Sequence, residues 1–149
     1  MSVLVRPVEL GDLDQLVDLC AAHAAFERST LPAPNANRLV AALFDAPARL
    51  FAWVAVDTHR QLAGYASATI DYSTWWASDF IHLDCLYVRE GMRGQSIGHR
   101  LLSAARDYAL SRGLKQMQWQ TPDWNIDAQR FYERFGPRRS TKVRYALDL

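Results

Sequence analysis

The sequence has few cysteines: Cys20 and Cys85 are the only two among 149 residues. Neither belongs to a Cys-X-X-Cys pair or to a cysteine and histidine spacing that binds metal, so we expect two reduced thiols and no metal site. The chain also lacks an excess of charge, since 17 lysines and arginines stand against 16 aspartates and glutamates, a formal net charge of +1. Nucleic acids and anionic membranes require a clustered basic surface, so neither is expected as a partner.

Long apolar runs are absent as well. The first 15 residues carry Arg6, Glu9, Asp12 and Asp14 where a signal peptide would be apolar, and no later run approaches the roughly 18 residues of a membrane span. A cytoplasmic protein is therefore expected. No repeat, low-complexity segment or linker interrupts the chain, and a chain of this length buries one core without a disulfide. We expect a single domain over residues 1–149.

Apolar periodicity assigns the strands and helices. Alternation predicts strands over residues 3–8, 50–56, 61–70, 80–88, 115–120 and 143–149. Helical spacing predicts four helices. The first begins at Asp12, the second spans residues 38–44, the third follows Gly98 and ends at Gly113, and the fourth runs from Asn125 to Gly136. Asp12 is expected to cap the first helix with Gln15 in the manner of a capping box. The order strand, two helices, three strands, helix, strand, helix, strand predicts an α+β fold with a central mixed, mostly antiparallel sheet flanked by helices.

One segment is typical of an anion site. The strand over residues 80–88 leads through Arg93-Gly94-Gln95-Ser96-Ile97-Gly98 into the clearest helix. Loop amides and first-turn amides have no internal acceptor, and the helix dipole adds partial positive charge, so such a junction binds phosphate or pyrophosphate. The segment fits neither the P-loop nor the Gly-x-Gly-x-x-Gly spacing of dinucleotide sites. Taken alone, it is equally compatible with a turn that only joins strand and helix.

With a second motif, this segment resembles the GCN5-related N-acetyltransferase (GNAT) superfamily. The family's Gln/Arg-x-x-Gly-x-Gly/Ala signature binds the pyrophosphate of acetyl coenzyme A, and here Ser96 replaces its internal glycine. The family's Asn-x-x-Ala-x-x-x-Tyr helix is matched by Asn125, Ala128 and Tyr132. The resemblance spans nearly the whole chain and implies a GNAT-like fold with acetyl-CoA as cosubstrate. The residues it implies in cofactor binding are Leu86, Tyr87, Val88, Arg93, Gly94, Gln95, Ser96, Ile97, Gly98, His99, Asn125 and Ala128.

The stretch from Trp76 to Tyr132 looks like the spermidine/spermine-type diamine acetyltransferase branch. Asp84 falls on an acidic residue of that branch's active-site strand, and Phe26-Glu27 falls on its Tyr-Glu pair. The resemblance therefore implies that a cationic amine is bound. The residues expected to bind it are Phe26, Glu27, Trp76 and Asp84. Glu27 is equally compatible with a solvated charge at a helix end.

Two departures from that branch widen the range of acceptors. Thr74 replaces an acid before Trp76, and basic residues stand near the carboxyl end where the branch has further acids. The basic residues are Arg138, Arg139, Lys142 and Arg144. They allow an acceptor with a carboxylate as well as an amine. The aromatic residues Trp75, Trp76 and Tyr72 would form an apolar or cation–π wall over the amine; equally compatible alternatives are packing onto the sheet and a dimer contact.

Acetyl transfer to an amine requires a base and an acid. Asp84 is the candidate base, and Tyr132 is the candidate acid that protonates the departing thiolate. Asp84 could instead be a strand carboxylate with no catalytic role. Tyr132 could instead be a core residue, because it shares an apolar face with Phe131 and Phe135. The sequence thus predicts an acetyl-CoA-dependent N-acetyltransferase that acts on a small primary amine, polyamine-like or amino-acid-like, by direct transfer in a ternary complex.

Two other functions remain open at this point. One is a noncatalytic acyl-CoA-binding sensor or partner module, and the other is acetylation of a protein or antibiotic amine. Ser96, which replaces the motif glycine, is the feature compatible with a noncatalytic binding module. The presence of both a candidate base, Asp84, and a candidate acid, Tyr132, favours an enzyme. A homodimer is implied by the family resemblance.

Overall fold

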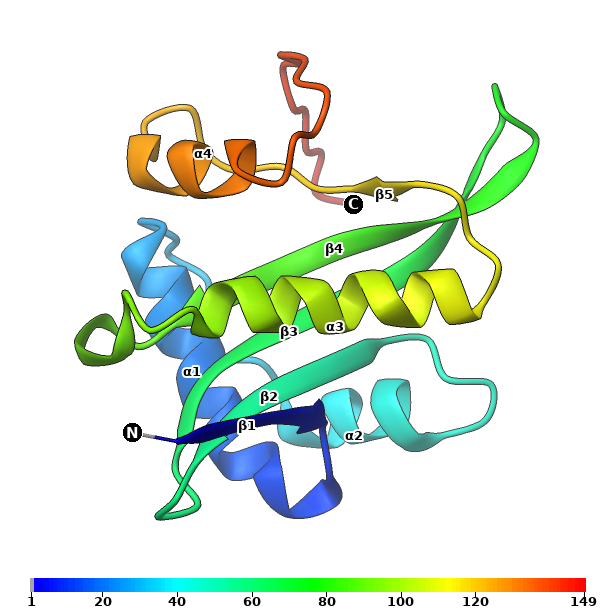
Figure 1. The fold of residues 1–149 in the computed structure, drawn as a ribbon. Coiled ribbons are helices and arrows are strands. Elements are labelled where there is room, and N and C mark those ends of the chain that lie inside the picture. The colour runs from blue at the N-terminus through cyan, green and yellow to red at the C-terminus, as the bar shows by residue number, and fades with distance from the viewer. Residues whose placement is uncertain (1) are drawn as a thin grey trace.

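The computed structural model describes residues 2–149 (Figure 1). In chain order the strands and helices are β1 (Val3–Pro7), α1 (Leu13–Phe26), α2 (Ala36–Phe44), β2 (Phe51–Asp57), β3 (Leu62–Ser73), β4 (Ser78–Val88), α3 (Ile97–Ser111), β5 (Met117–Gln118) and α4 (Ile126–Glu133). Short 3₁₀ turns at Leu10–Asp12 and Glu90–Met92 precede α1 and α3.

The strands form one mixed sheet in the order β1-β2-β3-β4-β5. Neighbours from β1 to β4 are antiparallel, and β5 runs parallel to β4. Helix α3 crosses one face of the sheet, and α1 and α2 cover the other (Figure 1). Because successive side chains of a strand point to opposite faces, Trp53 and Ala55 pack on the α3 side while Ala52 and Val54 pack on the α1 side. The expected α+β fold with a mixed, mostly antiparallel sheet is confirmed.

The prediction of a last strand over residues 143–149 is wrong. This segment has no regular structure, and Val143, Tyr145 and Leu147 are 75%, 89% and 85% exposed. Their alternation fits an extended chain, but a strand also needs a neighbouring edge with free N–H and C=O groups. The outermost strand, Met117–Gln118, is too short to provide such an edge.

Several boundaries also differ from prediction, including those of β5 and α2. The strand expected over residues 115–120 is shorter because β5 leaves β4 after pairing with Ile81 and His82. Helix α2 begins two residues early, since the Asn35 side chain accepts the amide of Arg38 at 3.1 Å and caps the helix.

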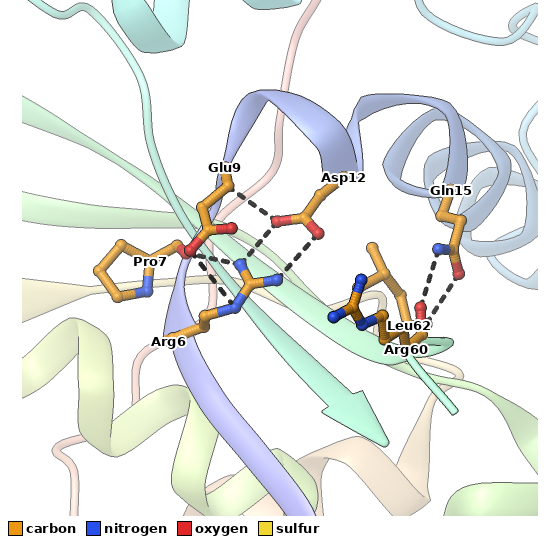
Figure 2. Close-up of polar contacts among 7 residues, drawn as sticks. All are labelled: Arg6, Pro7, Glu9, Asp12, Gln15, Arg60 and Leu62. Carbon is orange, nitrogen blue, oxygen red and sulfur yellow. Dashed lines mark hydrogen bonds and ion pairs between the residues drawn. The ribbon is translucent and has the colours of Figure 1, made fainter. Parts of the chain in front are cut away.

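The first helix is held by an ion pair rather than by the predicted capping box. Figure 2 shows the Arg6 guanidinium donating to both carboxylate oxygens of Asp12, at 2.7 and 3.0 Å. The Glu9 amide also donates to Asp12, at 2.8 Å. These bonds stabilise the ionised carboxylate, so the hydrogen bond with Arg6 holds the pKa of Asp12 below its usual value. A bidentate guanidinium binds a carboxylate more strongly than helix amides do, which explains why Asp12 turns toward β1.

Gln15 is likewise used elsewhere. Its Oε1 accepts from the Leu62 amide at 2.9 Å, and its Nε2 donates to the Arg60 carbonyl at 3.1 Å (Figure 2). The side chain thereby ties α1 to the start of β3, and the predicted partnership with Asp12 is wrong.

Candidate functional site

One edge of β4 is left without a strand partner beyond its first residues. Within the described part of the chain, β5 pairs only with Ile81 and His82, so the edge of residues 83–88 on that side is unpaired. An unpaired edge offers N–H and C=O groups to an extended ligand in the manner of an added strand. Leu86, Tyr87 and Val88, which the family resemblance implies in cofactor binding, lie on this stretch.

The loop after β4 presents backbone donors. Across residues 2–149, no acceptor takes the amides of Gly94, Gln95 and Ser96, which directly precede the first turn of α3. Gly94 and Ser96 both have a left-handed backbone, with φ of 79° and 60°. Successive amides before a helix N-terminus form a concave anion site, because all point outward and the helix dipole adds positive charge. Ser96 thus adopts at this position the conformation that favours glycine.

Gly98 has a packing role that the sequence did not reveal. A Cβ at this position would lie 3.2 Å from Cζ of Phe131, so glycine lets α4 pack closely on the start of α3. His99, in the same turn, stacks on Phe135 with ring centroids 4.7 Å apart. Asn125, as expected, caps α4 by accepting the Ala128 amide at 3.2 Å. The first turn of α3 therefore packs on the carboxyl-terminal part of α4, beside the loop of residues 93–96 (the anion loop).

The Arg93 side chain points back toward β4. Its Nε donates to the Val88 carbonyl at 3.0 Å, and its guanidinium carbon lies 4.6 Å from the Phe26 ring centre and 5.7 Å from that of Tyr87. A cation over an aromatic face is attracted by the ring quadrupole. The same guanidinium charge acts on His23 and helps to lower its pKa. Arg93 thus stands between the anion loop and the end of α1.

A buried hydrogen-bond chain links α1 to β3. His23 Nδ1 lies 2.9 Å from the Tyr65 hydroxyl, and His23 Nε2 lies 3.2 Å from Oε2 of Glu27. Because a carboxylate only accepts, Nε2 carries the hydrogen and Nδ1 accepts from Tyr65. Burial lowers the pKa of His23, so the neutral imidazole is favoured. Burial also raises the pKa of Tyr65, which keeps its hydroxyl a donor. The result is a Glu27 carboxylate fixed in orientation and half exposed.

His23 and Tyr65 were missed by sequence reasoning. The spacing of His23 and Glu27 places both on one face of α1, and that signal was available. The partnership with Tyr65, 42 residues away, was not, because it depends on how α1 packs on the sheet.

Asp84 lies exposed on β4 next to a thiol. Cys85 donates to Asp84 Oδ2 at a sulfur to oxygen distance of 3.7 Å. Burial, followed by the charge of Asp84, raises the pKa of Cys85 to about 12, and burial raises the pKa of Cys20 as well. Both are free thiols, as expected, and at neutral pH neither is a thiolate nucleophile.

Tyr132 comes from α4 and is half buried. It packs against Trp119 and Phe131, with ring centroids 5.5 and 5.3 Å away. Burial, together with the charge of Glu27, raises its pKa above the usual value, so the phenol is protonated at neutral pH. The charges of Glu27 and Asp84 also both act on His23. The structure thus brings three expected site residues, Glu27, Asp84 and Tyr132, into one electrostatic neighbourhood.

Trp76 lies apart from this neighbourhood. It stands at the tip of the hairpin between β3 and β4, which projects from the body at the far end of the strand from α1 and the anion loop (Figure 1). The strand from Ser78 to Asp84 alone covers roughly 20 Å. Trp76 is 48% and Trp75 92% exposed. Within one chain, Trp76 therefore does not lie beside the other residues expected to bind the amine.

A cluster of aromatic rings and a cation extends from Phe26 outward. The Phe26 ring lies 6.3 Å from the rings of both Tyr87 and Trp124, and the guanidinium carbon of Arg28 lies 3.9 Å above Trp124. Neither Arg28 nor Trp124 was singled out from the sequence as part of a site. Their contact joins the end of α1 to the turn before α4.

Comparison with known proteins finds a family whose model matches most of this chain. The family model described as "Acetyltransferase (GNAT) family" matches residues 15–136. This range contains β4 with its free edge, the anion loop, and Glu27, Asp84 and Tyr132.

Similar proteins include two amino-acid acetyltransferases. The chain is 28% identical to the thialysine N-epsilon-acetyltransferase of Sus scrofa, over 95% of this chain and 88% of that protein. It is 25% identical to the D-amino-acid N-acetyltransferase HPA3 of Saccharomyces cerevisiae, over 98% and 86%. Among solved structures, an aminoglycoside acetyltransferase from an uncultured soil metagenomic sample superposes with a TM-score of 0.83 at 18% identity, covering 99% of this chain and 96% of that one, which shows the shared fold. In residues 2–149 no helix is long and apolar enough to span a membrane.

Proposed function

Because the chain belongs to the acetyltransferase (GNAT) family and is an N-acetyltransferase, we propose that it transfers the acetyl group of acetyl-CoA directly to a primary amine of a small polyamine-like or amino-acid-like molecule. The observation that carries this proposal is the unpaired edge of β4 continuing into the free amides of residues 94–96, beside Glu27, Asp84 and Tyr132. The edge suits an extended amide-containing arm, and the amides suit a pyrophosphate.

The residues present fit acetyl-CoA. The backbone of residues 86–88 would bind the pantetheine arm, and the loop amides with Arg93 would bind the pyrophosphate. When bound, acetyl-CoA supplies the acetyl group as a thioester, an acyl donor whose transfer releases a thiol. The capped start of α4, with Asn125 and Ala128, would border the same path.

In the proposed reaction the two expected side chains move protons. Glu27, oriented by His23, binds the acceptor's ammonium group. Asp84, directly or through water, takes one proton from it and leaves a neutral amine. The amine nitrogen would then bond to the acetyl carbon as the carbon–sulfur bond breaks, and the Tyr132 hydroxyl would donate its proton to the departing sulfur. The second proton of the attacking nitrogen would pass through water to the Tyr132 phenolate, which leaves a neutral amide, a free thiol and a protonated Asp84. Because the raised pKa of Tyr132 keeps that phenol protonated, the proton is in place.

Direct transfer is supported by the state of the nearby thiol. A route through an acetylated cysteine needs a thiolate, and the pKa of Cys85, raised to about 12, keeps the group protonated. A ternary complex of both substrates is therefore proposed rather than an acyl-enzyme.

A second candidate is an acyl-CoA-binding module without turnover. Ser96 favours it, because a residue with a side chain stands in the left-handed conformation where the family has glycine. The enzyme is supported instead by the carboxylates of Glu27 and Asp84, whose charges both act on His23, and by the charge of Glu27 acting on Tyr132.

A cytoplasmic homodimer completes the proposal. A dimer is supported by the exposed apolar side chains of the carboxyl-terminal segment, Val143, Tyr145 and Leu147, and by Trp75 at the hairpin tip. A second copy covering them would remove apolar area from water. The two free thiols are compatible with a reducing compartment.

The deciding experiment is thiol release from acetyl-CoA across a panel of amines, with coenzyme A binding measured in parallel. The panel contains spermidine, putrescine, lysine and other amino acids, an aminoglycoside and a histone-tail peptide. Turnover with small amines is the expected result. Turnover only with the aminoglycoside or the peptide would mean that the acceptor is an antibiotic or a protein amine instead of a small amine. Tight coenzyme A binding without turnover would establish the binding module.

A further inference from the structure

Arg28 occupies a backbone position that favours glycine. It follows the last turn of α1, where its amide donates to the Ala25 carbonyl at 3.1 Å and the Ser29 amide donates to the Ala24 carbonyl at 2.8 Å. This is the end of a helix in which one residue adopts the left-handed conformation, and Arg28 does so with φ of 62°. A side chain at this angle is strained and glycine is not. The strain suggests that the side chain itself is used.

The guanidinium of Arg28 is held in place without an acid. Its central carbon lies 3.9 Å above the Trp124 ring, and no carboxylate within residues 2–149 forms an ion pair with it. The contact with the ring holds the guanidinium over Trp124 and leaves its N–H groups for an outside acceptor. A planar guanidinium binds a carboxylate through two parallel hydrogen bonds.

The neighbours of Arg28 connect it to the proposed acceptor site. Glu27 precedes it, and the ring of Trp124 contacts Phe26, which in turn contacts Tyr87 on β4. Arg93 lies on the Phe26 ring as well, but its Nε is fixed on the Val88 carbonyl at the entrance of the anion loop. Arg93 is thus already bonded to β4 beside the proposed coenzyme path, whereas Arg28 directly follows Glu27, the residue expected to bind the ammonium group, and its guanidinium lies on Trp124.

We propose that Arg28, stacked on Trp124, binds the carboxylate of an amino-acid acceptor whose side-chain amine is acetylated; this assignment rests on the proposed function. The contacts that start at Arg28 run through the rings of Trp124 and Phe26 before they reach Tyr87 on β4, a separation of two rings along this path. An α-amine lies one carbon from its carboxylate and does not cross that separation, whereas the amine at the end of a lysine or ornithine side chain does. The acceptor class is thus a diamino acid rather than a simple diamine.

Matched acceptors test this assignment. Lysine and cadaverine, and likewise ornithine and putrescine, differ only by the carboxylate. Replacement of Arg28 by glycine removes the guanidinium and also the strain of the left-handed residue, so the variant is expected to fold with an unchanged or higher melting temperature. We expect R28G to lower kcat/KM about tenfold or more for lysine and ornithine, and to leave cadaverine and putrescine within about twofold. R28K should recover only part of the loss, because an ammonium neither stacks nor binds in bidentate fashion as a guanidinium does.

The control removes the same charge elsewhere. Arg38 is exposed on α2, and R38Q should leave all four acceptors unchanged. Equal losses for acceptors with and without a carboxylate, or no loss for lysine, would overturn the role of Arg28. Binding of lysine and cadaverine to the wild-type and R28G proteins, measured by calorimetry, separates this proposal from the broader one. If no amine is acetylated, the proposed function fails. In that case tighter binding of lysine than of cadaverine, lost in R28G, would still support the carboxylate site. Equal affinity of the wild-type protein for lysine and cadaverine would refute it.

Discussion

The imidazole of His23 accepts a hydrogen bond from the Tyr65 hydroxyl at 2.9 Å, and burial favours the neutral form of the ring. The ring also stacks on Tyr87, with centroids 5.1 Å apart. The histidine therefore joins three elements, α1, β3 and β4, and fixes Glu27 at the end of the first. This geometry requires the neutral ring, since a protonated Nδ1 no longer accepts from Tyr65.

Stability is expected to fall at acid pH because of His23. Burial lowers its pKa from the ordinary value of 6.5, so below that pH the unfolded chain binds a proton that the folded chain does not. The free energy of unfolding should decrease as the pH falls through about 6.5, and be independent of this group above about pH 7.5. In H23Q the slope between about pH 7 and pH 5 should become smaller, as measured by urea denaturation at several pH values. The same change at the exposed His59 is the control, and an identical slope in H23Q and wild type would show that His23 does not titrate on unfolding.

Much of the fold followed from local pattern, and the parts that did not depend on partners. The alternation of β2, β3 and β4 and the helical spacing of α3 are fixed by which side chains are buried, so the sequence predicts them. Alternation over residues 143–149 predicts an extended chain equally well. The local sequence does not indicate whether a neighbouring strand edge is available to pair with it. The capping signal at Asp12 was overridden by Arg6, six residues earlier in the chain.

The site divides in the same way. The anion loop and the cap of α4 are contiguous motifs, and both occur where the sequence placed them. His23 with Tyr65, and Arg28 with Trp124, are pairs from distant segments, and their meaning arises only when α1 packs beside β3 and α4. Single residues of these types on an apolar helix or in a loop carry no local signal.

Replacement of Ser96 by glycine should strengthen coenzyme binding. The left-handed backbone at φ of 60° strains any side chain, and relief of that strain is expected to raise the free energy of unfolding by up to about 1 kcal/mol. Loss of the Cβ also allows closer approach of a pyrophosphate to the loop amides, so the Kd for coenzyme A should fall a few-fold. Calorimetric titration and thermal unfolding measure both effects. The same substitution at Ser103, inside α3, should instead destabilise by about 0.5–1 kcal/mol, and weaker coenzyme binding by S96G would mean that the serine hydroxyl contributes.

Gly98 should be intolerant of even one methyl group. The new Cβ would lie 3.2 Å from Phe131, and the ring has to move, so we expect G98A to cost about 1–3 kcal/mol despite better helix propensity. F131L makes room and should restore part of the loss, which gives a coupling energy above about 0.5 kcal/mol in a double-mutant cycle. At Gly91 a Cβ would have no neighbour within 4 Å among residues 2–149, and G91A is the matched control. Strict additivity of G98A and F131L would refute this packing role.

Replacement of Tyr132 by phenylalanine should lower kcat and leave coenzyme binding nearly unchanged. Only the hydroxyl is removed, and loss of a general acid typically costs a factor of about 10² or more. Because burial raises the pKa of Tyr132, no loss of kcat from its ionisation is expected in wild type below about pH 10. C85A is the companion variant and should retain turnover, since the pKa of Cys85, raised to about 12, removes it as a nucleophile. An unchanged kcat in Y132F would eliminate the acid role, and an inactive but folded C85A would favour an acyl-enzyme route.

The carboxyl-terminal segment should determine the oligomeric state. Val143 and Leu147 are 75% and 85% exposed in one chain, so replacing both by asparagine removes no buried contact within the protomer and should leave the melting temperature of an isolated protomer unchanged. Apolar residues at alternate positions of an extended segment present one continuous face, which a second copy would cover. Light scattering coupled to size exclusion should therefore give a dimer for wild type and a monomer for V143N/L147N. Ala146 stands at the opposite phase of the alternation, and A146N should remain dimeric. A monomeric wild type, or a dimer that survives V143N/L147N, would contradict this account and leave the hairpin with Trp75 as the surface to test next.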